Sequence, residues 1–211
     1  MEIQRLIRLK TNGNPKWEEK FDKVSEVVLE HIDILTETAN EFSTFAKLYS
    51  EEPVLVDLDK TLRDQILIFD NKENISIGYI GMQEAYVMAP RPQLIRVFVN
   101  LIANALQAVE IRQKEMTENG EEALAGKVVI ALRNSNKDGY YDIVVDDNGP
   151  GVKEENLSKL FTPNFTTKSG GTGLGLAICR NIIEKCEGTI TYSKSFGLGG
   201  ASFTVTLPKH V

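Results

Sequence analysis

Cysteine is scarce in this sequence, with two among 211 residues. Both of them, Cys179 and Cys186, fall in a segment with helical periodicity, which separates them by about 10 Å along the helix axis. That separation exceeds the span of a disulfide bridge. We therefore expect two reduced thiols in the core of the protein.

Long apolar runs and excess positive charge are also missing. No apolar run approaches the roughly 18 residues of a membrane span, and the first residues, "MEIQRLIRLK", lack the apolar core of a signal peptide. The net charge of −6 argues against nonspecific nucleic-acid binding, which needs a cationic surface to displace counterions. We expect a cytoplasmic chain that contacts neither nucleic acid nor membrane, while a membrane-anchored parent protein stays open.

The composition that remains is that of a globular protein, with 42% hydrophobic and 26% charged residues. The length suits one domain with an extension, or two small domains. The spacing of apolar residues changes near residue 53, which predicts a helical domain over residues 1–52 and a second domain over residues 53–211.

Residues 15–50 are predicted to form one long helix, with Asn14 as its N-cap and Pro15 in its first turn. Its apolar stripe alternates steps of three and four residues, which is the heptad seam of a coiled coil or helical bundle. The stripe consists of Phe21, Val24, Val28, His31, Leu35, Thr38, Phe42, Phe45 and Tyr49. A helix with such a seam must be covered, and residues 2–10 offer only a short antiparallel helix. We therefore expect a homodimer through the N-terminal helix, or further chain upstream.

His31 lies on this seam. It could be a phosphate acceptor or a packed seam residue, and we favour the packed residue.

From residue 54 onward, strands and helices alternate. Strands are predicted in "PVLVDL", "ISIGYIG", "EAYVMAP", "KVVIALRN", "YYDIVVDD", "TITYSKS" and "ASFTVTLP", with helices at 58–69 and 92–112 and a glycine-led helix that ends at Lys185. The second and third of these strands look like a hairpin, and "SNKDG" is a good turn between the fourth and fifth. This pattern predicts a mixed sheet with helices on one face, an α/β two-layer sandwich.

Two asparagines stand out on the helix 92–112. Asn100 and Asn104 are four residues apart, so they share a face with Arg96 and Gln107. Amide oxygens can ligate a hard cation such as Mg²⁺. The alternative is a pair of structural hydrogen bonds, and the helix alone does not separate the two.

The stretch "VVDDNGPGV" ends a predicted strand with two aspartates. If Ile143 and Val145 face the core, strand alternation turns Asp147 inward as well. A buried carboxylate needs a hydrogen-bonding partner, and an adenine amine would be a matching donor. Gly149 and Gly151 would let the backbone approach a ring closely, although a plain turn explains the same residues.

A glycine-rich loop, "LFTPNFTTKSGGTGLGLA", precedes the last predicted helix. It lacks the Gly-Lys-Ser/Thr ending of a P-loop and the strand–turn–helix context of a Rossmann motif. A flexible loop at a helix N-terminus favours phosphate, and Thr166, Thr167, Lys168 and Thr172 add donors. The residues before the helix could move as a lid.

The order and spacing of these motifs resemble the ATP-binding domain of sensor histidine kinases. This domain belongs to the superfamily with the Bergerat ATP-binding fold, which includes type II topoisomerases, heat-shock chaperone ATPases and mismatch-repair ATPases. "NLIANALQA" is similar to the N box, "DDNGPGV" to the G1 box, "LFTPNFTTK" to the F box and "GGTGLGLA" to the G2 box. The resemblance covers about residues 54–208 and is nearest to the nitrogen-regulation class.

The resemblance implies a role for each matching residue. Asn104 would hold Mg²⁺, Asn100 would sit beside the triphosphate and Asp147 would read the adenine amine, with catalysis resting on Asn100 and Lys168. The further ATP-binding residues it implies are Gly149, Gly151, Thr167, Gly171, Thr172, Gly173, Leu174, Gly175 and Leu176. Gln107 is a departure, because many members have a basic residue there, and this leaves the phosphate charge to Arg96, Lys168 and the metal.

The superfamily's hydrolytic branches carry a glutamate at the Asn100 position. An asparagine cannot act as a base, so transfer of a phosphoryl group to a protein fits better than ATP hydrolysis. By this resemblance the chain is the catalytic fragment of a two-component kinase with a response-regulator receiver domain as partner. A serine kinase of the anti-sigma-factor type and a nucleotide-sensing module without transfer remain as alternatives.

"EHIDILTETANEFSTFAKL" resembles the second helix of the dimerisation and phosphotransfer hairpin of these kinases. The first helix of that hairpin should carry a His followed by an acidic residue and, a few positions on, a Pro. The sequence contains no such run, since Ile32 follows His31 and Val211 follows His210. We expect that the acceptor His is absent and that this chain cannot autophosphorylate.

Overall fold

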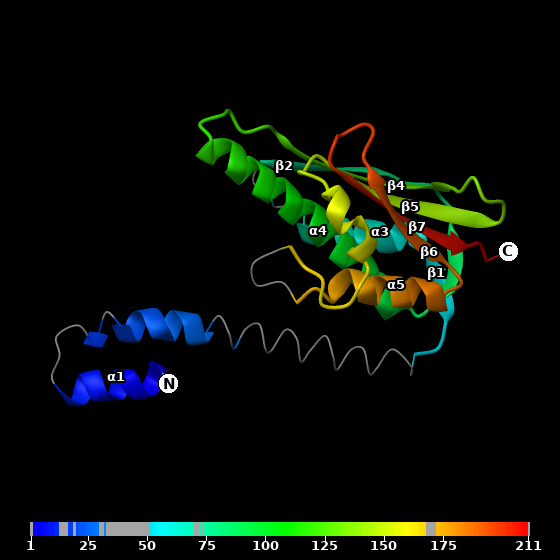
Figure 1. Ribbon diagram of the computed structural model, residues 1–211. Coiled ribbons are helices and arrows are strands. Elements are labelled where there is room, and N and C mark those ends of the chain that lie inside the picture. Colours follow the sequence, from blue (N-terminus) through cyan, green and yellow to red (C-terminus); the bar gives the residue numbers. More distant parts are fainter. Residues whose placement is uncertain are drawn as a thin grey trace. The chain divides into compact units, whose positions relative to one another are not determined.

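The computed structural model describes residues 2–12, 17–18, 20–29, 32, 51–69, 72, 74–167 and 172–210. The chain divides into two compact units, of which the first comprises residues 1–46 with Thr166–Thr172 and the second comprises the rest. The positions of the two units relative to each other are not determined (Figure 1).

The first unit contains helix α1 (Glu2–Thr11) and a second helical stretch at residues 20–29. The Lys10 ammonium lies over the Trp17 ring, 4.8 Å from its centroid, and Trp17 packs on Phe21. The predicted short first helix is therefore confirmed. Most of the predicted heptad helix, including Asn14, Pro15 and His31, lies outside the described residues.

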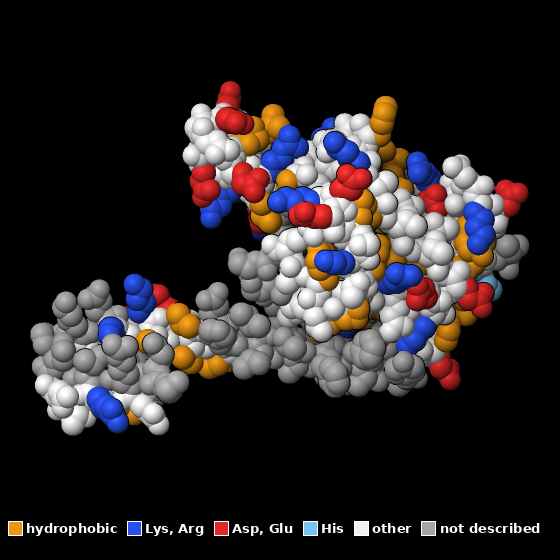
Figure 2. Space-filling view, viewed as in Figure 1, with side chains coloured by type: hydrophobic (Ala, Val, Ile, Leu, Met, Phe, Trp, Pro, Cys, Tyr) orange, Lys and Arg blue, Asp and Glu red, His pale blue; other side chains and the backbone are white. Residues whose placement is uncertain are grey.

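Apolar side chains remain exposed on the described part of this second helix. Phe21 is 50% exposed and Leu29 is 61% exposed, and Val27, Val28 and Ile32 are also exposed. Figure 2 shows apolar side chains at the surface of the N-terminal segment. Of these side chains, Phe21 and Val28 belong to the predicted heptad seam, whereas Val27, Leu29 and Ile32 do not.

The second unit is built on a five-stranded sheet with the strand order β2-β4-β5-β7-β6. Its strands are β2 (Ile75–Ile80), β4 (Gly126–Asn134), β5 (Tyr140–Asp147), β6 (Thr189–Lys194) and β7 (Ala201–Pro208). β2 pairs with β4 in parallel, and every other neighbouring pair in this sheet is antiparallel. The predicted mixed sheet is confirmed, and so is the hairpin between β4 and β5.

Three helices cover one face of this sheet (Figure 1). They are α3 (Leu58–Phe69), α4 (Arg91–Glu118) and α5 (Gly175–Lys185), and a 3₁₀ turn, η1 (Glu154–Lys159), follows β5. The core lies between the two layers, where Phe98, Leu101 and Leu106 of α4 meet Ile130 and Ile143 of the sheet, all of them almost fully buried. Both cysteines are buried and unbridged, as expected. The two-layer α/β sandwich is confirmed.

The predicted hairpin between residues 75–81 and 84–90 is wrong. β2 joins the large sheet, whereas β3 (Tyr86–Ala89) pairs antiparallel with β1 (Val54–Asp57) in a separate two-stranded sheet. The apolar side chains explain the split, because Val87 and Ala89 are buried together with Val56 of β1. Burial against a distant strand outweighs the short connection that suggested local pairing.

Helix α4 is longer than predicted. It continues six residues beyond 112, to Glu118, through residues with good helix propensity and an i,i+4 ion pair of 3.8 Å between Lys114 and Glu118. Among the described helices, α4 alone is long and apolar enough to match a membrane span. Nine of its residues are buried inside the protein, so the same composition serves a core helix.

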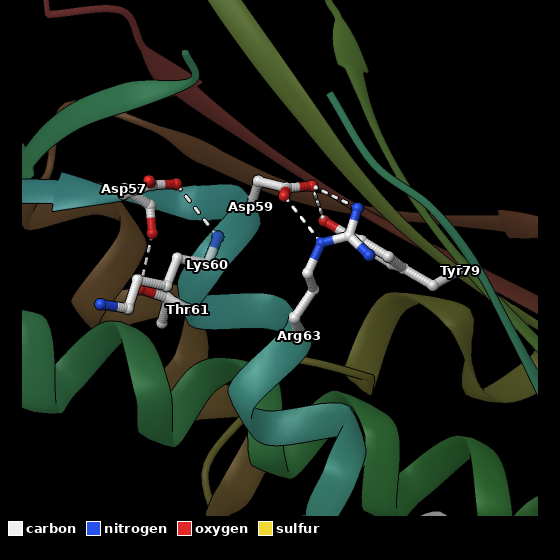
Figure 3. Close-up of polar contacts among 6 residues, drawn as sticks. All are labelled: Asp57, Asp59, Lys60, Thr61, Arg63 and Tyr79. Atoms are coloured by element: carbon white, nitrogen blue, oxygen red, sulfur yellow. Dashed lines mark hydrogen bonds and ion pairs between the residues drawn. The ribbon is translucent and has the colours of Figure 1, made fainter. Parts of the chain in front are cut away.

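A polar cluster fastens the start of α3 to β2 (Figure 3). Asp57 caps the helix, since its Oδ1 accepts a hydrogen bond of 3.0 Å from the Lys60 amide. Farther along, the Asp59 carboxylate accepts hydrogen bonds from Arg63 Nε at 2.8 Å and from the Tyr79 hydroxyl at 2.7 Å. These bonds connect a helix with a strand that is distant in the sequence, which fixes the edge of the sheet under α3.

Candidate functional site

The two asparagines of α4 lie side by side. Asn104 Nδ2 donates a hydrogen bond of 2.8 Å to Asn100 Oδ1, and both residues are half-buried. Asn100 also abuts the start of α5, because a side chain at Gly175 would collide with the Asn100 carboxamide. The structure therefore brings Asn100, Asn104 and the N-terminus of α5 together, as the motif order suggested.

Asp147 ends β5 with its carboxyl group inside the protein. It is 2% exposed, and it continues the buried row of Ile143 and Val145, so the predicted orientation is confirmed. Its Oδ1 accepts hydrogen bonds from the amides of Gly149, at 2.8 Å, and Ala201, at 3.1 Å. Neither of these two bonds involves the other carboxyl oxygen, Oδ2.

Burial raises the pKa of Asp147, and the two amide hydrogen bonds only partly oppose this effect. The β6–β7 hairpin supports the same residue, because the Gly200 amide donates to the Asp147 carbonyl at 3.1 Å. Sequence reasoning did not find the contribution of this hairpin. In the sequence, only Gly199 and Gly200 mark this hairpin, and they look like an ordinary turn.

The loop after Asp147 needs glycine at two positions. A Cβ at Gly149 would lie 2.7 Å from the Cβ of Ala108 on α4, and Gly151 has φ +74°. The two glycines are thus required, one for close approach and one for its backbone conformation. Gly149 lies against the same face of α4 that carries Asn104.

Arg112 is a residue of the site that sequence reasoning missed. Its Nη1 donates hydrogen bonds to the carbonyls of Asn148, at 2.7 Å, and Gly149, at 3.2 Å, so it holds this loop from α4. Positions 100, 104, 108 and 112 follow one face of the helix, and this spacing could have revealed it. Beyond Arg112 lies an open hollow of about 370 Å³, lined by Arg112, Glu115, Met116, Asn119, Glu121, Gly149, Pro150 and Gly199.

The glycine-rich segment leads into α5 as expected. Gly173 has φ +68° and packs against the backbone of Asn164 and Phe165, where a Cβ would not fit. Leu174 and Leu176 pack against the hydrophobic core, which anchors the start of the helix. Thr167 and Thr172 belong to the first unit, and Lys168 and Gly171 lie outside the described residues, so their predicted contacts stay predictions.

The residues at this site suit one kind of metal ligation. Among the described residues, no group of three His, Cys, Asp or Glu side chains could hold a metal ion. A cation here would take an amide oxygen of the asparagine pair together with phosphate and water oxygens. Mg²⁺ accepts such a set, since it keeps several waters and is commonly shared with substrate phosphates.

The family model described as "Histidine kinase-, DNA gyrase B-, and HSP90-like ATPase" matches residues 89–211. The chain is 38% identical over 122 residues to the sensor histidine kinase ZraS of Salmonella typhi, a match that covers 58% of this chain and 23% of ZraS. It is 34% identical over 210 residues to the sensor protein FixL of Bradyrhizobium diazoefficiens, which covers 97% of this chain and 38% of FixL. The chain thus spans less than two fifths of these relatives.

Among solved structures, the catalytic domain of histidine kinase ThkA is similar to this chain. The TM-score is 0.62 at 30% identity, and the match covers 75% of this chain and 96% of the ThkA domain. The family match begins at residue 89, just before α4, and therefore includes Asn100, Asn104, Asp147 and the start of α5.

Proposed function

Because the chain belongs to the family of histidine kinase-, DNA gyrase B- and HSP90-like ATPases, we propose that it is the catalytic part of a two-component sensor histidine kinase. It binds Mg-ATP and transfers the γ-phosphoryl group to a histidine on a helical hairpin, from which the group passes to an aspartate of a response-regulator receiver domain. The observation that carries this proposal is the Asn100–Asn104 pair, set against the start of α5.

Asp147 recognises the adenine ring in this proposal. Its Oδ1 is occupied by the amides of Gly149 and Ala201, so Oδ2 is the oxygen that accepts from the exocyclic amine. A buried acceptor of this kind discriminates strongly between adenine and bases that lack the exocyclic amine, because such a base leaves the carboxylate unpaired. Adenine specificity therefore rests on a single oxygen atom.

The phosphate side is built by α4 and the N-terminus of α5. The first amides of α5 and its helix dipole favour the triphosphate, with Gly173 and Gly175 permitting close approach. Asn104 provides an oxygen ligand to Mg²⁺, which would neutralise charge on the phosphates. We assign Thr167, Lys168, Gly171 and Thr172 to a lid over them, with Lys168 as a catalytic donor.

Asn100 determines which reaction follows. Its carboxamide has no proton affinity near neutral pH, so it cannot activate water for hydrolysis. It can position the γ-phosphate for attack by an imidazole nitrogen. The phosphorus then forms a bond to that nitrogen as its bond to the bridging oxygen breaks, and ADP leaves.

The partners follow from the same proposal. The heptad seam of residues 15–50 pairs with a second copy of the chain, and exposed Phe21 and Val28 belong to that seam. The FixL match extends over nearly the whole chain, including this helix, which supports a histidine kinase over a serine kinase of the anti-sigma-factor type.

Neither His31 nor His210 precedes an acidic residue, so the acceptor histidine is supplied by another segment.

The proposal is tested by incubating the chain with γ-³²P-ATP, Mg²⁺ and a separate dimeric helical hairpin that carries a His followed by an acidic residue. We expect label on the hairpin that is stable in alkali and lost in acid, as for phosphohistidine. An Asn104→Ala variant should transfer far less. The chain alone should stay unlabelled.

Three outcomes would contradict this proposal. Acid-stable label on a serine substrate would support the serine kinase, and binding of ATP without transfer to any acceptor would support a nucleotide sensor. Label on the chain itself that disappears in His31→Ala would show that His31 is the acceptor.

A further inference from the structure

Arg96 lies on α4 one turn before Asn100, on the same face of the helix. The residue is half-buried, and its Nη1 atom is fully buried. Within the part of the chain that the structure describes, this is the one buried side-chain nitrogen or oxygen without a hydrogen-bond partner. Buried polar groups are almost always paired, so this donor needs an explanation.

The surroundings place the guanidinium at the junction of α4 and α5. Burial raises the pKa of the Cys179 thiol to about 12, and the charge of Arg96 acts in the opposite direction across the space between the two helices. Cys179 lies one turn into α5, whereas Gly175 at the start of α5 abuts Asn100. Arg96 therefore lies one helical turn from the place where Asn100 of α4 meets Gly175 of α5.

We propose that Arg96 binds the γ-phosphate of ATP through its guanidinium group. The proposal rests on the proposed function, which puts the triphosphate between Asn100 and the N-terminus of α5. Side chains four residues apart on a helix have Cβ atoms only about 6 Å from each other, and an arginine side chain reaches farther than that. An acceptor oxygen on the terminal phosphate beside Asn100 is thus within reach.

The charge balance of the site supports this assignment. The exposed residue at position 107 is a glutamine, so α4 offers no cation in the turn that follows Asn104. Arg112, two turns beyond Asn104, is already bonded to the carbonyls of Asn148 and Gly149. Among the described residues of α4, Arg96 is the cation that combines an unpaired buried donor with a place next to Asn100.

The test compares two nucleotides that differ in the γ-phosphate. Binding of Mg-ADP and of the slowly hydrolysed analogue Mg-AMPPNP is measured by calorimetry for the 211-residue chain and for Arg96→Gln, Arg96→Lys and Arg91→Gln. Arg91 is the matched control, since it lies on the same helix and is half-exposed in a 3.8 Å ion pair with Asp64.

We expect Arg96→Gln to weaken AMPPNP binding about tenfold, as for loss of one charge-assisted hydrogen bond, while ADP binding changes by less than about twofold. Arg96→Lys should recover part of the loss, and Arg91→Gln should leave both affinities unchanged. If Arg96→Gln weakened the binding of both nucleotides by the same factor, or changed neither affinity, Arg96 would only pack α4 against α5. If the unaltered chain bound neither nucleotide, the proposed function itself would fall.

Discussion

At the scale of single residues, Asp147 combines a stability cost with the adenine-recognition role that we propose for it. Burial raises its pKa, which means that the folded protein holds the proton more tightly than the unfolded chain does. The free energy of unfolding is therefore reduced by this group above its raised pKa. The reduction disappears as the pH falls below the ordinary range of an aspartate.

Asp147→Asn should separate the two effects. The amide oxygen can still accept from Gly149 and Ala201, and the charge is gone, so thermal unfolding without nucleotide at neutral pH should occur no lower than in the parent. ATP binding should weaken by about 10- to 100-fold, because an NH₂ group would face the adenine amine, donor against donor. Calorimetry and a pH series of thermal melts measure both.

Asp146→Asn is the matched control for Asp147→Asn. Asp146 is the preceding residue of β5, half-buried and on the opposite face of the strand, so its substitution should leave ATP affinity unchanged. Normal ATP binding by Asp147→Asn would remove the adenine role from this residue.

At the scale of elements, the cluster around Asp59 joins α3 to β2. Burial alone would raise the pKa of Asp59, but the hydrogen bonds from Arg63 and Tyr79 outweigh it and the pKa is lowered. The ionised carboxylate therefore stabilises the fold above the ordinary pKa of an aspartate. This stabilisation is lost as the pH falls through the lowered value.

Tyr79→Phe should lower the free energy of unfolding at neutral pH by about 1 kcal/mol, the net value of one hydrogen bond. The loss should shrink in acid, where Asp59 is protonated in both proteins. Urea unfolding at neutral and acidic pH measures this, with Tyr86→Phe on β3 as the control tyrosine. A loss that does not change with pH would show that the hydroxyl does not act through the Asp59 carboxylate.

The contact between α4 and α5 makes a second prediction at this scale. Gly175→Ala adds a methyl group where the Asn100 carboxamide now lies, and a flexible carboxamide can move aside. Alanine also favours the helix by about 1 kcal/mol over glycine. We expect unchanged or slightly higher thermal stability together with a marked loss of Mg-ATP binding.

Gly78→Ala on β2 is the control for Gly175→Ala, because its new Cβ would make an ordinary contact of 3.6 Å with Val129. It should leave ATP binding intact. If Gly175→Ala bound Mg-ATP normally, the position of Asn100 would not matter for the nucleotide.

At the scale of the whole molecule, sequence patterns captured what depends on neighbours along the chain. Strand alternation placed Asp147 inside, and helical spacing placed Asn100 beside Asn104. Contacts between distant segments were out of reach, since no local period encodes them. The pairing of β3 with β1 and the bond from the Gly200 amide to the Asp147 carbonyl are of this kind.

The separation into two units predicts independent roles for them. The core of the second unit is formed by α3, α4, α5 and the two sheets, so residues 53–211 should fold alone and bind Mg-ATP as tightly as the 211-residue chain. The heptad helix is absent from this fragment, so it should be a monomer, whereas the longer chain should be a dimer. Light scattering after size-exclusion chromatography and calorimetry measure the two properties on the same samples.

Substitutions in the seam provide the matched control for this truncation. Val24→Glu with Val28→Glu in the 211-residue chain puts charge into the predicted dimer contact, and should give a monomer whose ATP affinity is unchanged. A dimeric fragment of residues 53–211 would move the dimer contact to the second unit. Loss of ATP binding on truncation would show that the N-terminal helix completes the nucleotide site, because the remaining residues of that site are all retained.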